Sequence, residues 1–124
     1  MSFREVRLIG LLAGILLFSS LGAAQEKKLM HCFFFTPITE ATQAEWDAFY
    51  KATYDLPDKI PGLDKVWAGK LRTTSKNRDY GVCMEITNEA ALKIYTDHPA
   101  HSDWVKVYAK VRVAGTSTFD IIEH

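Results

Sequence analysis

Residues 29–36 carry the sequence LMHCFFFT, a short and densely apolar run that ends at Pro37. A run of this length, rich in aromatic residues and stopped by proline, predicts a buried β-strand. Side chains alternate between the two faces of a strand. One face then carries His31, Phe33 and Phe35, and the other carries Met30, Cys32 and Phe34. Because both faces are apolar, we expect both faces of the sheet to be covered.

The residues after this strand predict a helix. Residues 42–45 read TQAE, which fits the capping box of a helix start. Side chains at helical spacing then form the expected inward stripe, made of Trp46, Phe49, Tyr50 and Thr53. We expect Pro57 and the Pro61-Gly62 pair to end this helix and to turn the chain.

The rest of the chain predicts three more strands and a second helical region. Strands are predicted at residues 63–71, 80–86 and 117–123, with an exposed connection at residues 72–79. Asn88 is a suitable N-cap for a second helix. The sequence HPAH at residues 98–101 interrupts that helix, because proline disfavours helical backbone at the preceding residue but suits the first turn of a new helix.

The expected order is strand, helix, strand, strand, helix, strand. This is the ferredoxin-like βαββαβ arrangement of the α+β class. Helices cover only one face of such a sheet, so the other face needs a second layer. The simplest cover for a domain of this size is the same face of a second copy. The sequence therefore predicts a homodimer that forms a dimeric α/β barrel.

The N-terminal segment has the three parts of a secretory signal. Arg4 and Arg7 precede an uncharged apolar run at residues 8–18, and small residues then suit cleavage after Ala24. The run is shorter than the roughly 20 residues of a membrane-spanning helix. We expect residues 1–24 to be a signal peptide, residues 25–124 to be one domain, and the protein to be secreted or periplasmic. The alternative is an uncleaved segment that stays as an anchor.

The charge balance gives no reason to expect a polyanionic partner. Without residues 1–24 the chain has 13 basic and 14 acidic residues, which is a net charge of −1. Nucleic acids and anionic membranes attract strongly basic surfaces. We therefore expect no nucleic-acid partner, and no stable membrane association after signal cleavage.

Two cysteines, Cys32 and Cys83, lie in predicted strands. Export would place them in an oxidising compartment, where two thiols can form one disulfide. Two buried, unpaired cysteines are the alternative.

Several features together resemble the stress-responsive dimeric α/β-barrel (Dabb) family. A histidine opens the first strand (His31), Pro61-Gly62 precedes the second, and HPAH at residues 98–101 follows a short helix. The resemblance covers essentially all of the chain after the signal segment. Two stretches are similar to the plant polyketide cyclases of this family in particular, namely VWAGK at residues 66–70 and YTDHPAH at residues 95–101.

This resemblance implies a cofactor-independent lyase, cyclase or isomerase for a small apolar or carbonyl-containing molecule. In the cyclases the residues that match Tyr95 and His101 are catalytic, and a histidine that matches His31 lies close by. The resemblance implies His101 as the general base, and Tyr95 as the group that orients it or polarises a carbonyl. Histidine suits this role because its pKa lies near ambient pH. Tyr95 and His101 would not share a face of one continuous helix, so only a bend at Pro99 would bring them together.

Substrate contacts are expected from three further residues, Tyr50, Trp67 and His98. A pocket tyrosine of the cyclases falls on Thr53 here, and Tyr50 lies one helical turn earlier. Trp67 and His98 belong to the two stretches that are shared with the cyclases.

For an enzyme of this kind we expect no cofactor and no metal. Two alternatives to it stay open. His31, His98 and His101 would give three nitrogen ligands with an open position, as catalytic zinc sites have. The second alternative is a non-catalytic module that binds a small ligand or protects against stress as a stable dimer.

Overall fold

The computed structural model describes residues 26–73 and 76–124, so the predicted signal peptide lies outside the described residues. Within the described ranges, seven elements follow one another in the order β1 (Leu29–Phe35), α2 (Gln43–Lys59), β2 (Leu63–Lys70), β3 (Tyr80–Ile86), α3 (Glu89–Asp97), α4 (Pro99–Tyr108) and β4 (Ser117–Ile122). This order confirms the predicted βαββαβ arrangement, with the second helix split in two at residue 98.

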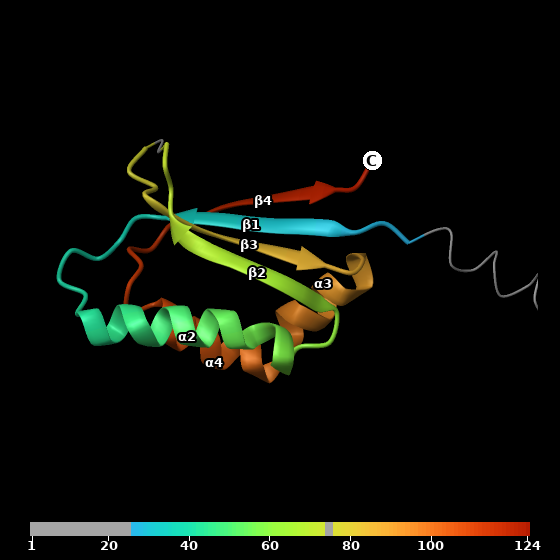
Figure 1. The fold of residues 1–124 in the computed structure, drawn as a ribbon, viewed down its shortest axis with the longest axis horizontal. Helices are drawn as coiled ribbons and strands as arrows, with labels where there is room; N and C mark the ends of the chain where they lie inside the picture. The colour runs from blue at the N-terminus through green and yellow to red at the C-terminus, as the bar shows by residue number, and fades with distance from the viewer. Residues whose placement is uncertain (1–25, 74–75) are drawn as a thin grey trace, which may run out of the picture.

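The strands form one sheet in the order β2-β3-β1-β4, and every neighbouring pair is antiparallel. All three helices lie on the same side of this sheet (Figure 1). The result is a ferredoxin-like α+β fold, as predicted. A two-layer arrangement of this kind buries one face of the sheet and leaves the other face without helices.

The core lies between the sheet and the helices. The side chains that alternate toward the helices on β1 and β3 are almost inaccessible, for example Phe35, Val82 and Met84 at 0% exposure. They pack against aromatic side chains of α2 and α4, which include Phe49 and Tyr108. Each such side chain contributes roughly 1.5–3 kcal/mol through the removal of apolar surface from water.

The opposite face of the sheet is apolar and open. Cys32 and Cys83 face each other in register at its centre and form a disulfide, which decides between the two alternatives for these cysteines. Large apolar side chains around them remain exposed: Met30 at 36%, Trp67 at 73%, Phe119 at 58% and Ile121 at 63%. The expectation that both faces are covered is therefore not met by the described part of the chain alone.

Local signals set most helix ends as expected. Thr42 and Glu45 form the predicted capping box, and the Asn88 side chain accepts a hydrogen bond from the Ala91 N–H. The expectation that Pro57 ends α2 is wrong, because the helix continues through this proline to Lys59. Leu56 and Ile60, both at 1% exposure, hold the last turn against the core. Among the described helices, none has the length and apolar character that a membrane crossing requires.

Candidate active site

A cavity of about 190 Å³ opens between the sheet and the two helices α3 and α4. Side chains from four parts of the chain surround it. Its lining residues are His31 and Phe33 of β1, Tyr95 of α3, His101, Trp104, Val105 and Tyr108 of α4, and Arg112 and Thr116 before β4 with Thr118 in β4. Three of these residues, His31, Tyr95 and His101, are the ones that the sequence singled out as catalytic.

The break between α3 and α4 brings Tyr95 and His101 together. His98 has an extended backbone and caps α4, and its Nδ1 accepts a hydrogen bond of 3.0 Å from the Ala100 N–H. Pro99 then starts α4, where its missing N–H costs nothing. As a result the Tyr95 and His101 rings lie 4.5 Å apart between centroids. His31 reaches the same place from β1, with its ring 5.7 Å from that of Tyr95.

Burial sets the protonation states of this pair. It lowers the pKa of His101 below the ordinary value of 6.5, and the neighbouring His31 lowers it further, while a backbone hydrogen bond to Thr96 acts in the opposite direction. Burial also raises the pKa of Tyr95 far above its ordinary value of 10. At neutral pH the site therefore presents a neutral imidazole, which accepts a proton, beside a neutral hydroxyl, which donates a hydrogen bond.

His31 is held by a carboxylate that the sequence analysis missed. Its Nδ1 lies 2.5 Å from Oδ1 of Asp120, and the two residues are paired in the β1–β4 register. A carboxylate accepts the Nδ1 proton, so it fixes the ring orientation and leaves Nε2 to act as an acceptor. A sequence signal existed, because Phe119 and Ile121 on one face of β4 place Asp120 on the other face.

The aromatic wall of the cavity is fixed from behind. The Trp104 indole donates a 2.9 Å hydrogen bond to Oγ1 of Thr53, and the Thr53 hydroxyl donates a 2.6 Å hydrogen bond to the Phe49 carbonyl. Thr53 is fully buried, so neither polar group is left without a partner. Trp104 stacks on Tyr108 with centroids 4.7 Å apart, and both rings face the cavity.

The three expected substrate contacts lie elsewhere. Tyr50 packs against Trp46 and Phe49 on α2 and does not line the cavity. Trp67 is on the open face of the sheet, opposite Cys83 in register. His98 borders a separate hollow between α2 and α4. The structure thus brings His31, Tyr95 and His101 together and leaves Tyr50, Trp67 and His98 outside.

The histidine set of the metal alternative is separated in the same way, because His98 does not share the cavity of His31 and His101. Across residues 26–73 and 76–124, no group of three His, Cys, Asp or Glu side chains is arranged to hold a metal ion.

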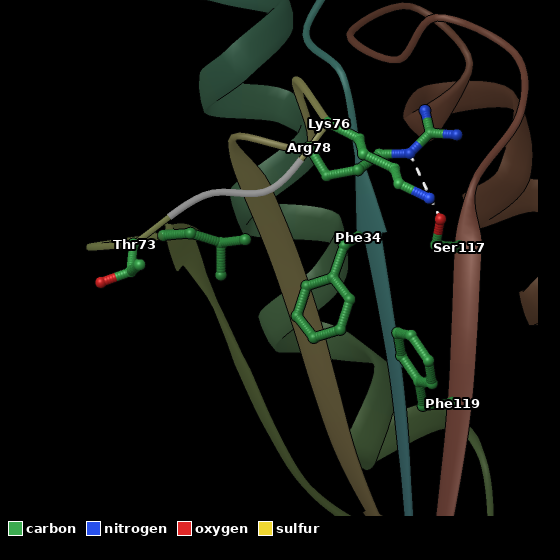
Figure 2. Close-up of a pocket in the computed structure, with 7 residues that line it drawn as sticks. Phe34, Thr73, Lys76, Arg78, Ser117 and Phe119 are labelled. Atoms are coloured by element: carbon green, nitrogen blue, oxygen red, sulfur yellow. Dashed lines mark hydrogen bonds between the residues drawn. The ribbon is translucent and has the colours of Figure 1, made fainter.

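A larger hollow of about 490 Å³ lies on the open face of the sheet. Figure 2 shows Phe34 and Phe119 side by side on neighbouring strands, with Arg78 reaching toward Ser117. The described residues that line this hollow are these four with Leu71, Thr73 and Lys76, and none of them is a histidine or a carboxylate. General acid–base chemistry near neutral pH is best served by such groups. The smaller cavity is therefore the candidate active site.

Comparisons with known proteins agree with this geometry. The family model of the stress responsive A/B barrel domain (Dabb) matches residues 29–122. The chain is 36% identical over 73 residues to olivetolic acid cyclase of Cannabis sativa, and the match covers 56% of this chain and 71% of that protein.

Two solved structures show the same fold at low sequence identity. One is a dimeric ferredoxin-like protein of unknown function from Thermobifida fusca, with a TM-score of 0.65 and 23% identity over 78% of this chain and 92% of the other. The second is the hydroxynitrile lyase from Passiflora edulis, with a TM-score of 0.70 and 10% identity over 80% of this chain and 95% of the other.

Proposed function

This chain belongs to the family of stress responsive A/B barrel (Dabb) domains, and from that premise we propose that it is a cofactor-independent lyase, cyclase or isomerase for a small carbonyl compound. The family membership predicted from the sequence is confirmed. One observation carries the proposal. Tyr95, His101 and His31, with Asp120 behind His31, meet around one cavity that also has an aromatic wall.

The first step is a proton transfer from carbon. The neutral His101 imidazole takes a proton from the carbon next to the substrate carbonyl, and the electron pair of that C–H bond moves onto the carbonyl oxygen as an enolate. The Tyr95 hydroxyl donates a hydrogen bond to this oxygen, which stabilises the developing negative charge. His101 suits the role because its lowered pKa keeps it unprotonated at neutral pH.

The next step depends on the substrate. The enolate carbon attacks a second carbonyl in a ring closure, the enolate expels a leaving group from the adjacent carbon in an elimination, or it takes a proton back at another position in an isomerisation. The proton held by His101 goes to the new alkoxide, to the leaving group or to carbon, which restores the neutral imidazole. His31 is the second group that can accept a proton, since it lines the cavity and Asp120 accepts its Nδ1 proton, which leaves Nε2 as an acceptor. The relatives support this range of reactions, since one is named a cyclase and another a lyase.

We further propose that the chain is a homodimer. The open face of the sheet carries Met30, Trp67, Phe119 and Ile121, all exposed. A contiguous apolar face of this kind marks an interaction surface. A second copy of the same face covers it symmetrically, and the relative from Thermobifida fusca is described as dimeric.

Export is also part of the proposal. The disulfide between Cys32 and Cys83 supports an oxidising compartment, because disulfides persist in secreted and periplasmic proteins and are rare in the cytosol. The pattern of residues 1–24 is the reason for a secreted or periplasmic location.

The experiment follows deuterium exchange by proton NMR. Levulinate, a small and stable keto acid, and its methyl ester are incubated in D₂O with the protein, and the signals next to the ketone are monitored. We expect exchange faster than in buffer, with the acceleration lost in His101→Gln. His98→Asn is the matched control, because it removes a histidine outside the cavity and keeps a good N-cap.

The non-catalytic alternative predicts a different result in the same assay. A binding module retains the probe but leaves its protons at the buffer exchange rate. Equal acceleration by wild type and His101→Gln would contradict the role of His101.

A further inference from the structure

Arg112 lines the candidate active site from the segment between α4 and β4. Its backbone is fixed there, because it pairs with Pro37 in an isolated bridge and the neighbouring Val113 N–H donates to the Thr36 carbonyl. Its guanidinium lies over the Tyr108 ring, 4.6 Å from the centroid. Its Nη1 donates a long hydrogen bond of 3.4 Å to Oγ1 of Thr116.

One further donor of this arginine has no partner. Nε of Arg112 is fully buried, and among the described residues it is the one such side-chain atom that lacks a hydrogen-bond partner. Burying a polar donor without a partner costs free energy. A buried donor in this state, on a side chain that lines the cavity, calls for an explanation.

The charge of Arg112 is equally unbalanced. None of the ion pairs within residues 26–73 and 76–124 involves it. The cavity lining contains no carboxylate, and Arg112 is its one permanently charged side chain among the described residues. The Tyr108 ring attracts the cation but does not neutralise it. Arg112 therefore brings a positive charge to the cavity without an ion-pair partner of its own among the described residues, while the Asp120 carboxylate behind the cavity is bound to His31.

We infer that Arg112 binds the carboxylate of the substrate, so that this pocket takes a small keto acid, with its carboxylate at Arg112 and its carbonyl at Tyr95 and His101. The carbonyl end of this inference rests on the proposed function, whereas the carboxylate end rests on Arg112 alone. A guanidinium suits the role, because its planar fork of donors matches the two oxygens of a carboxylate. A hollow of about 190 Å³ has room for the keto acid portion of such a ligand.

Isothermal titration calorimetry with levulinate and methyl levulinate tests the inference. The two probes share the ketone and differ in charge. We expect wild type to bind levulinate roughly tenfold or more tightly than the ester, and Arg112→Gln to lose this preference. Arg112→Lys keeps the charge without the fork and should retain part of the preference.

The matched control is Lys110→Gln, which removes the same charge from an exposed position two residues away. It should bind levulinate like wild type. A thermal shift measurement on wild type alone gives a second readout, since levulinate should raise the melting temperature more than the ester does. Equal binding of acid and ester, or a preference that survives in Arg112→Gln, would overturn the inference.

The binding and exchange measurements test the two proposals separately. A carboxylate preference that depends on Arg112, without accelerated deuterium exchange, supports this inference and counts against the proposed function. Exchange that depends on His101, but is equal for acid and ester, supports the proposed function and overturns this inference.

Discussion

The rings of Tyr95 and His101 lie 4.5 Å apart although the two residues belong to different helices. The HPAH sequence produces this contact in two ways. His98 and Pro99 end one helix and start the next, and His101 follows in the first turn of the new helix. The motif therefore supplies both the bend between the two helices and the histidine that serves as the base. Tyr95 and His101 meet across this bend, not along one face of a single helix.

The Tyr95 hydroxyl can be removed with little change in packing. We expect Tyr95→Phe to lower the exchange rate about 10- to 100-fold, because the enolate oxygen loses a preorganised hydrogen-bond donor. The melting temperature should change little, since the ring still packs on His31 and His101. NMR exchange and circular dichroism measure the two effects. Tyr50→Phe, which removes a hydroxyl on α2 outside the cavity, is the control.

Acidification should reveal the lowered pKa of His101. The base form is the unprotonated one, so the exchange rate should decline as the pH falls, with a midpoint below pH 6.5. A decline centred above 6.5 would contradict burial as the dominant cause.

The same group links stability to pH. Folding lowers the pKa of His101 below 6.5. The contribution of His101 to the free energy of unfolding is therefore fully present above pH 6.5, and it is lost as the pH falls through the pKa of the folded state. We expect wild type to lose more thermal stability than His101→Gln between about pH 7.5 and about pH 5. Differential scanning calorimetry of both proteins checks the sign of this difference.

Thr53 should be a positioning residue for Trp104. Thr53→Val keeps the shape but leaves the indole N–H without its acceptor, which should cost about 1–3 kcal/mol in urea unfolding. Thr53→Ser keeps the hydroxyl and should recover most of this loss. Trp104 lines the cavity, so Thr53→Val should also raise the KM for a substrate more than it lowers kcat. Equal stability of the valine and serine variants would contradict this role.

The open face of the sheet makes a prediction about assembly. Analytical ultracentrifugation should find wild type as a dimer and the double variant Trp67→Glu, Phe119→Glu as a monomer, because two charges on each copy then enter an apolar interface. Ile94→Glu places the same charge on α3, at a side chain that is 47% exposed on the helix layer, and should remain dimeric. A monomeric wild type would contradict the dimer.

Local sequence patterns predicted the fold well. The apolar run at residues 29–36, the capping box at Thr42 and the break at Pro99 each depend on neighbouring residues, and each appears in the structure. Pro57 does not end α2, because the buried side chains of Leu56 and Ile60 stabilise a last turn that local rules disfavour.

The site was only partly predictable, because its members meet through tertiary contacts. Alternation separates Val66 from Trp67, but nothing local says which of them faces the helices, and Trp67 lies on the open side. Asp120 becomes a partner of His31 through the β1–β4 register. Arg112 is positioned by its bridge to Pro37, and no local pattern near residue 112 predicts this contact.

The ratio of levulinate exchange rates in wild type and His101→Gln tests the central claim most directly, with both proteins shown to be folded and His98→Asn as the reference. We expect wild type and His98→Asn to exchange the protons next to the ketone about 100-fold faster than His101→Gln at neutral pH. A ratio near one would contradict the assignment of His101 as the base.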